Sequence, residues 1–369
     1  MKGIYIHVPF CLKKCNYCDF CSYPDMTDRI SEYVLRANSE MEKYKNEKIE
    51  ADTLYFGGGT PSLLSVEQIS NLLKGAKENF KIMPKSEITI EANPCTVNSQ
   101  KANAWKNMGI NRISLGAQTF SDSELKKLGR IHNSEDTKRA FSILRDAGFD
   151  NISLDLMYAI PNQDEKSLKD TLKEFITLSP EHISCYGLKI EEGTPFSNFL
   201  EKGEISEKSD EEYENMYHII KDTLEINGYE QYELSNFSKD GKHSRHNVKY
   251  WTGEEYVGIG PGASSLYGGK RYTNTGDFEK YLSSFELSED IILSKEDLMS
   301  EFMFLSLRLT KTGASKTLFR ERFGHDIWEV FPDAIKKHLG NGLLKDEGDR
   351  YILAQRAYYI SNYVLCDFV

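Results

Sequence analysis

The chain has 369 residues, which is more than a single hydrophobic core usually organises, so we expect two domains. Its formal net charge of −11 at pH 7 argues against a general electrostatic attraction to nucleic acid or anionic lipid. No apolar run approaches the roughly 20 residues that span a bilayer, and the first residues lead into a predicted strand rather than a signal peptide. Seven cysteines, four of them close together, indicate a reducing compartment, so we expect a cytoplasmic protein.

A predicted strand near the start ends at Pro9 and is followed by three closely spaced thiols, Cys11, Cys15 and Cys18. Packed thiolates suit zinc or an iron–sulfur cluster, but a four-thiolate zinc site usually needs a second pair of cysteines, and none exists here. The spacing CxxxCxxC resembles the one by which radical SAM proteins hold a [4Fe–4S] cluster. That resemblance implies three thiolates on three irons, with the fourth iron open to S-adenosylmethionine (SAM). Cys21 has no place in the pattern, and we expect it to be a bystander; structural or redox thiols are the alternative interpretation.

Strand and helix patterns alternate along the first part of the chain. The expected strands are residues 4–9, 52–56, 87–91, 112–115, 151–157 and 182–188. The expected long helices are residues 28–48, 65–80, 99–107, 134–147, 164–178 and 208–227. Such alternation predicts a parallel sheet wrapped by helices. Because six units are too few for a closed eight-stranded barrel, we predict an α/β fold with a partial (β/α)6 barrel, whose chemistry gathers at the carboxyl ends of the strands.

The remainder of the chain has a different character. Residues 236–294 carry a run of polar and aromatic residues and a glycine-rich loop, and we interpret them as a linker region after a core of residues 1–235. Residues 295–369 show helical patterns followed by a predicted hairpin over 343–352, an order that indicates a small α+β, winged-helix-like C-terminal domain. Such a shape often binds DNA, but no basic stripe supports that use here. We therefore expect a packing or partner domain.

Polar residues at the predicted strand ends could hold SAM, which is a zwitterion with a ribose and an adenine. Residues 57–59 are glycines, which allow the backbone to approach a ligand closely. Glu91 and Asp155 end strands where an unpaired charge would be costly to bury. Gln118 follows another strand, and Arg130 can form a bidentate pair with a carboxylate. Each residue alone is also compatible with an ordinary strand end or turn.

Six motifs in one order extend the resemblance over nearly the whole chain: IHVPFC, GGGTP, EANP, GAQTF, LGRIH and DLMYAIP. Together they resemble the family of oxygen-independent coproporphyrinogen III oxidases and their relatives. The resemblance implies SAM contacts at Tyr5, Gly58, Gly59, Thr60, Glu91, Gln118, Arg130 and Asp155.

Two branches of this family differ at the start of the chain and near residue 246. The decarboxylase carries an N-terminal extension, whereas Tyr5 is almost at the start here, and Phe20 stands where the decarboxylase typically has another cysteine. The run HNVKYW resembles the HNxxYW run of the HemW-type haem chaperones. Haem iron accepts His or Tyr, and aromatic rings offer flat faces to a macrocycle. The resemblance implies haem contacts at His246, Asn247, Tyr250 and Trp251. A packed interior histidine with core aromatics is the alternative, and His243 could compete as ligand.

The leading functional hypothesis is a haem chaperone that binds haem and delivers it to an acceptor protein, with a [4Fe–4S] cluster and SAM bound. The alternative is an enzyme, an oxygen-independent coproporphyrinogen III oxidase that forms protoporphyrinogen IX by oxidative decarboxylation in porphyrin biosynthesis. A third hypothesis is another radical SAM reaction on an unrelated substrate. The expected partners are haem and a haem-accepting protein rather than nucleic acid. A transient contact with a membrane-bound acceptor and a homodimer are both compatible with the sequence.

Overall fold

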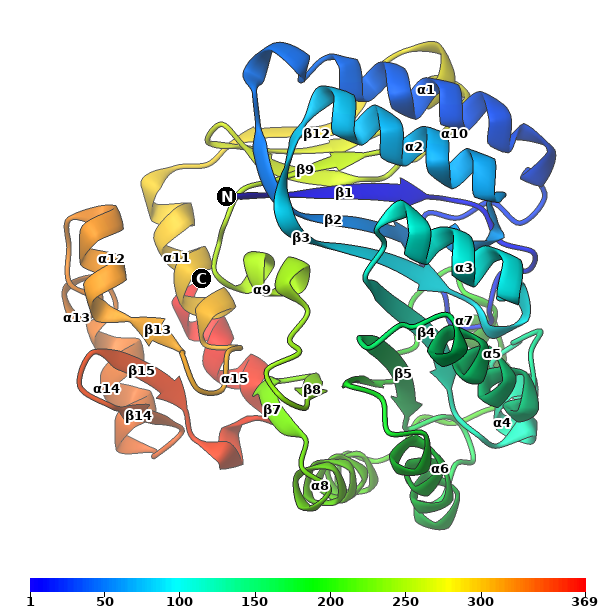
Figure 1. Cartoon of the computed structure of the whole chain (residues 1–369). Coiled ribbons are helices and arrows are strands. Elements are labelled where there is room, and N and C mark those ends of the chain that lie inside the picture. Colours follow the sequence, from blue (N-terminus) through cyan, green and yellow to red (C-terminus); the bar gives the residue numbers. More distant parts are fainter.

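Six parallel strands form the centre of the protein, as the alternation predicted. The computed structural model describes all 369 residues (Figure 1). The strands lie side by side in chain order: β1 Lys2–Val8, β2 Glu50–Gly58, β3 Lys81–Ala92, β4 Arg112–Gln118, β5 Ile152–Tyr158 and β6 His182–Gly187. All five neighbouring pairs are parallel. The predicted partial barrel is therefore confirmed.

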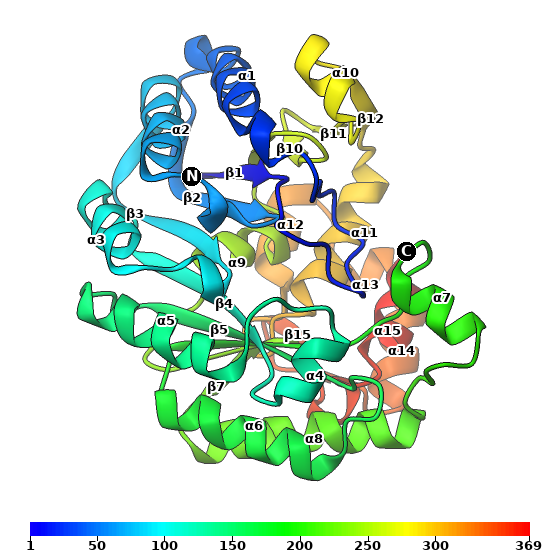
Figure 2. The ribbon, with the colours of Figure 1, turned by 90° about the vertical axis from the view of Figure 1, so that its right-hand side faces the viewer.

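Helices cover the outer face of these strands (Figures 1 and 2). They are α1 Ile30–Glu42, α2 Val66–Asn79, α3 Ser99–Met108, α4 Asp122–Lys127, α5 Ser134–Asp146, α6 Glu165–Leu178 and α8 Asp210–Ile226. The expected capping box is present, because Ser65 accepts the backbone N–H of Gln68 and the Gln68 side chain accepts that of Ser65. Apolar side chains such as Ile4 and Ile6 pack toward the helices. The alternate residues face the inside of the barrel and are mostly polar, which leaves room there for a site.

The sheet is wider than the sequence suggested, because six further strands extend it at both edges. At the β6 edge lie β8 Asn236–Ser238 and β7 Glu230–Glu233, both antiparallel to their neighbours. At the β1 edge lie β9 Tyr256–Ile259, parallel to β1, and then β10 Ser264–Tyr267, β11 Lys270–Asn274 and β12 Leu287–Ile292. Two further helices are α7 Pro195–Glu201 and α10 Phe278–Ser283. The stretch 236–294, expected as a linker, thus contributes strands to the main sheet.

A buried carboxylate ties this later part of the chain to α1. Glu40 is 3% exposed and accepts hydrogen bonds from the Gly260 N–H at 3.0 Å and the Tyr281 hydroxyl at 2.7 Å. Its other oxygen accepts from the Asn274 amide at 2.7 Å. Burial raises the pKa of Glu40, although these three donors favour its ionised form. The chain after residue 255 is therefore held to α1 by these hydrogen bonds and to β1 by strand pairing.

A second hydrophobic core organises the C-terminal part. It gathers 19 buried residues, including Phe302, Phe319 and Phe323. The helices are α11 Lys295–Ser306, α12 Lys316–Phe323, α13 Ile327–Val330, α14 Pro332–Gly340 and α15 Ser361–Leu365. The strands are β13 Ala314–Ser315, β14 Leu344–Asp346 and β15 Arg350–Leu353, in the order β13-β15-β14. The antiparallel pair β14 and β15 is the predicted hairpin. No helix in the whole protein has the length and apolar character needed to cross a bilayer.

Candidate functional site

A cavity of about 440 Å³ opens where the parallel strands end. All three predicted cluster cysteines line it, as do seven of the eight residues expected to contact SAM: Gly58, Gly59, Thr60, Glu91, Gln118, Arg130 and Asp155. The cavity is deep, because its lining runs along β4 from Gln118 at the end of the strand to Arg112 at its beginning. The motifs that the sequence singled out therefore meet at one place.

The three thiols lie on the loop after β1 and are partly buried. Thr60 Oγ1 is 3.5 Å from Cys11 Sγ, and Arg130 Nη1 is 3.5 Å from Cys15 Sγ. Burial raises the pKa of Cys11, and it raises that of Cys18 to about 11. No three His, Cys, Asp or Glu side chains surround one single-ion position. Soft donors on one loop, each free to bind a separate iron, with a guanidinium beside them, fit an iron–sulfur cluster.

Cys21 points to a different neighbourhood. Its Sγ lies 3.2 Å from the Tyr23 hydroxyl, and a Cβ added at Gly262 would come within 3.0 Å of the same sulfur. Cys21 does not line the cavity. The fourth thiol therefore packs against the glycine-rich loop of residues 258–262, away from the other three.

The glycines after β2 place the backbone directly against the cluster loop. A Cβ at Gly59 would lie 2.8 Å from the Phe10 carbonyl oxygen, and Gly58 has a φ of +109°. The Gly58 N–H donates to Glu91 Oε2 at 3.1 Å, and the Tyr55 hydroxyl donates to Glu91 Oε1 at 2.8 Å. Burial raises the pKa of Glu91 to about 7, so this carboxyl can exchange a proton near neutral pH.

The strands β4 and β5 supply a second carboxylate and a cation. The Ser114 hydroxyl donates to Asp155 Oδ1 at 3.2 Å, and burial raises the pKa of Asp155 to about 6. Gln118, with a φ of +66°, turns the chain at the end of β4. Arg130 Nη2 donates to the Gly116 carbonyl oxygen at 2.9 Å, which holds its guanidinium beside Cys15. The carboxylates can accept hydrogen bonds from ribose hydroxyls and from an ammonium group. The guanidinium can pair with a carboxylate.

Tyr5 is the one expected SAM residue that does not line the cavity. Its hydroxyl lies 3.0 Å from His7 Nδ1, and its ring lies 6.0 Å from that of Tyr55. Burial raises the pKa of Tyr5 well above its usual value. Tyr5 therefore packs behind the residues that face the cavity.

The HNVKYW run forms a short helix, α9 Arg245–Trp251, which lies inside the barrel (Figure 1). His246 is 1% exposed, and its ring stacks on that of Tyr55 at 5.1 Å. Its Nδ1 lies 2.8 Å from Thr53 Oγ1, and its Nε2 lies 2.9 Å from the Tyr250 hydroxyl oxygen. Burial lowers the pKa of His246 to about 3, so the imidazole is neutral at physiological pH. Both ring nitrogens are engaged within the protein.

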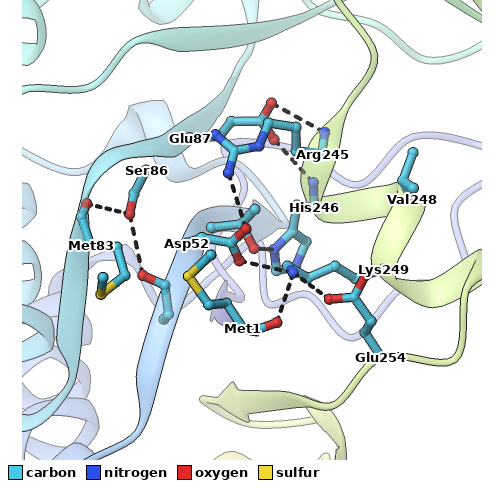
Figure 3. Close-up of polar contacts among 12 residues, drawn as sticks. Met1, Asp52, Met83, Ser86, Glu87, Arg245, His246, Val248, Lys249 and Glu254 are labelled. Carbon is cyan, nitrogen blue, oxygen red and sulfur yellow. Dashed lines mark hydrogen bonds and ion pairs between the residues drawn. The ribbon is translucent and has the colours of Figure 1, made fainter.

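Charged residues of β2 and β3 hold α9 in place (Figure 3). Glu87 accepts the backbone N–H groups of Arg245 at 3.1 Å and His246 at 3.0 Å, which are free donors at the start of the helix. Lys249 is 2.8 Å from Asp52 Oδ1 and donates to the Met1 carbonyl oxygen at 2.9 Å. Hydrogen bonds and an ion pair thus hold α9 at its N-terminal end and near its C-terminal end.

The other residues of the run face different surroundings. Asn247 lines the same cavity as the three cluster cysteines. Tyr250 packs edge-on against Tyr256 at 4.7 Å, and the Arg308 guanidinium of the C-terminal part lies 4.4 Å from the Trp251 ring centre. His243, the competing ligand candidate, stacks on the ring of Tyr232 at 4.1 Å. In this conformation the four expected haem residues do not share one open surface.

Sequence reasoning missed Arg112 and Ser114, which line the same cavity from β4. The signal was available, because Arg112, Ser114, Gly116 and Gln118 alternate along one strand and must point to one side. The motif GAQTF marks only the end of this strand, whereas Arg112 and Ser114 lie before it.

Comparison with known proteins places the chain in a family. The radical SAM superfamily model matches residues 5–175, and the HemN C-terminal domain model matches residues 293–360. The heme chaperone HemW of Bacillus subtilis (strain 168) is 36% identical, over 100% of this chain and 99% of that protein. The heme chaperone HemW of Lactococcus lactis subsp. lactis (strain IL1403) is 35% identical, over 100% and 97%. The chain belongs to the HemW family of the radical SAM superfamily.

Among solved structures, coproporphyrinogen III oxidase (HemN) from Escherichia coli superposes with a TM-score of 0.85. The match covers 99% of this chain and 89% of that chain at 20% sequence identity, so it shows a shared fold. Membership of the radical SAM superfamily implies a [4Fe–4S] cluster and SAM, and the thiols and polar cavity described above fit both groups.

Proposed function

We propose that the protein is a haem chaperone on a radical SAM scaffold, which binds haem and delivers it to an acceptor protein. One observation carries the proposal: the helix with the HNVKYW run lies inside the barrel, and its Asn247 lines the cavity of the cluster thiols. The HemW relatives match over the full length of the chain, which supports the same function.

In this proposal Cys11, Cys15 and Cys18 hold the [4Fe–4S] cluster, which supplies an electron-transfer centre and a binding point for SAM when it is bound. The residues for SAM itself are Tyr5, Gly58, Gly59, Thr60, Glu91, Gln118, Arg130 and Asp155. Glu91 and Asp155 accept hydrogen bonds from the ligand, and Arg130 neutralises its carboxylate. Tyr5 supports the site from behind through its contact with Tyr55.

For haem, we propose contacts with His246, Asn247, Tyr250 and Trp251. The low pKa of His246 keeps its imidazole neutral, which is the form that binds iron. Its Nε2 is occupied by Tyr250 in the present conformation, so haem binding through this atom requires Tyr250 to move aside. Haem uptake through Nε2 is therefore coupled to a movement of the Tyr250 side chain.

A haem titration of the purified, anaerobically reconstituted protein tests this function. We expect stoichiometric binding by the wild type and weaker binding by His246→Ala and Tyr250→Ala. Tyr44→Ala is the matched control, because the Tyr44 hydroxyl pairs with that of Tyr272 outside the cavity. Absence of haem uptake by the wild type would contradict the proposal.

The second candidate is oxidative decarboxylation of coproporphyrinogen III. It is favoured by the cavity, in which the cluster thiols and the SAM residues occur together, and by the fold shared with HemN. An anaerobic assay with reduced cluster, SAM and coproporphyrinogen III decides between the two. Formation of protoporphyrinogen IX would favour the enzymatic function over the haem chaperone.

The proposal extends to the setting of the protein. We propose a cytoplasmic protein that contacts membrane-bound haem acceptors only transiently and that can form a homodimer. Cell fractionation tests the location, and light scattering with and without haem tests the dimer. We also retain, as a proposal, a domain boundary near residue 295, because 18 of the 19 residues of the second hydrophobic core lie between Met299 and Phe368.

A further inference from the structure

Arg112 is a buried cation without a partner at the deep end of the cavity. It is the first residue of β4, is 1% exposed and lines the cavity. Its guanidinium takes part in none of the ion pairs of the protein, and its Nε atom is buried without a hydrogen-bond partner. An arginine carries five N–H donors and no acceptor, so a buried guanidinium without a counter-ion is a costly arrangement.

The nearest carboxylates are committed to other donors. Glu87 accepts two backbone N–H groups at the start of α9. Glu91 accepts from Tyr55 and Gly58, and Asp155 accepts from Ser114. These charges stabilise Arg112 at a distance, but none of them forms an ion pair with it. The fork of N–H donors is therefore available to a ligand.

Arg112 does not duplicate Arg130. The Arg130 guanidinium is held at the Gly116 carbonyl oxygen and beside Cys15, at the mouth of the cavity. Arg112 precedes Gly116 by four residues, which corresponds to about 13 Å along a parallel strand. The two cations thus serve two different depths of one cavity.

We propose that Arg112 anchors a carboxylate-binding subsite at the deep end of the cavity. A guanidinium pairs with a carboxylate through two parallel N–H···O bonds, which gives both affinity and orientation. Asn247 of α9 lines the same cavity, so the proposed haem helix borders the cavity that Arg112 also lines. Two ligands of the proposed function carry carboxylates, namely haem through its propionates and SAM through its methionyl group; for the methionyl carboxylate, Arg112 is the alternative to Arg130. The assignment of these two sources rests on the proposed function.

The test measures ligand binding by the reconstituted, anaerobic full-length protein and its Arg112→Gln and Arg112→Lys variants. One arm compares haem with haem dimethyl ester, in which the propionates are masked. The other compares SAM with decarboxylated SAM, which lacks the carboxylate. Arg36→Gln is the control, because Arg36 is a half-buried arginine outside the cavity that also has an unpartnered nitrogen. Circular dichroism and thermal unfolding establish that each variant is folded.

We expect Arg112→Gln to weaken binding of one carboxylate-bearing ligand by about ten- to a hundredfold and to leave its masked or decarboxylated counterpart unchanged. Arg112→Lys should recover part of the loss, because it keeps the charge without the fork. A loss confined to haem identifies the propionate, and a loss confined to SAM identifies the methionyl carboxylate. Unchanged binding in both arms, or an equal loss for the masked ligands, would overturn the subsite. If the wild type takes up no haem, the proposed function fails, while the SAM arm still decides the role of Arg112.

Discussion

The hydroxyl oxygen of Tyr250 lies 2.9 Å from Nε2 of His246, within one turn of the same helix. The candidate iron ligand is therefore occupied by another residue of its own motif. This relationship makes Tyr250 a competitor for the atom that haem would need, and it gives the haem proposal a specific test.

Tyr250→Phe should strengthen haem binding by up to roughly tenfold, because it removes a hydrogen bond to Nε2 while keeping the aromatic ring. The measurement is a spectroscopic haem titration of the reconstituted protein. Tyr44→Phe provides the comparison, since it removes a hydroxyl from a pair remote from the cavity. Unchanged or weaker binding by Tyr250→Phe would exclude Nε2 of His246 as the ligand atom.

Stability should depend on pH through His246. Burial lowers the pKa of His246 to about 3 in the folded state, against about 6.5 in the unfolded chain. Between these values the unfolded state binds the extra proton, so the contribution of His246 is lost progressively as the pH falls below about 6.5. At pH 5 this loss amounts to about 2 kcal/mol relative to neutral pH. Urea unfolding at both pH values should show a smaller loss in His246→Gln than in the wild type and in the control His218→Gln, which alters an exposed histidine. Equal losses in all three proteins would refute the assignment.

SAM affinity should rise with pH near neutrality. Burial raises the pKa of Glu91 to about 7, and the ionised form is the better acceptor and the better partner of a cationic ligand. Lowering the pH from 8 to 6 should therefore weaken SAM binding, by up to about tenfold per pH unit below the pKa. Isothermal titration calorimetry of the reconstituted protein measures the effect. Glu91→Gln should bind SAM weakly at every pH, and exposed Glu67→Gln should follow the wild type; a steep pH profile in Glu91→Gln would contradict this.

The cluster should depend on three thiols and not on the fourth. Cys11→Ser, Cys15→Ser and Cys18→Ser should each lose the iron and sulfide bound after anaerobic reconstitution, because each removes a soft ligand. Cys21→Ser should retain both, since Cys21 packs on Tyr23 and the glycine-rich loop. Iron and sulfide analysis with visible absorbance provides the readout. If Cys21→Ser lost the cluster and the other three variants kept it, the proposed set of ligands would be wrong.

The fixation of α9 should depend on Glu87 (Figure 3). Glu87→Gln leaves one acceptor for two backbone N–H groups and removes the charge at the start of the helix, which should cost about 1–2 kcal/mol of unfolding free energy. Urea denaturation measures the cost, with exposed Glu78→Gln as the control. A Glu87→Gln variant as stable as the wild type would show that packing alone holds the helix.

Much of the fold could be predicted because its signals are local. The six central strands are apolar or alternating segments bounded by glycine and proline, and the intervening helices carry caps such as Ser65 and Ser121. The residues after each strand end then meet by topology alone, since parallel strands deliver their carboxyl ends to one edge. This is why Glu91, Gln118 and Asp155 could be grouped before any contact was known.

The rest depends on contacts between distant parts of the chain. The strands from Tyr256 to Ile292 are four to six residues long, and their periodicity is too short to separate them from a loop. The surroundings of His246 are set by Thr53 and Tyr55, almost 200 positions earlier in the sequence. The Tyr5 hydroxyl lies beside His7 Nδ1, and Tyr5 is not among the residues that line the cavity. No local pattern encodes these arrangements.

The hydrogen bonds of Glu40 indicate where the protein can be truncated. All three donors to this carboxylate come from residues 260–281, although the barrel strands alone suggest a separable unit ending near residue 235. A truncated polypeptide stopping there would leave the Glu40 carboxylate of α1 without its three hydrogen-bond donors and would expose the β1 edge that β9 covers. Expression of the barrel as an autonomous piece should therefore yield aggregated material, and functional dissection is better pursued by point substitution.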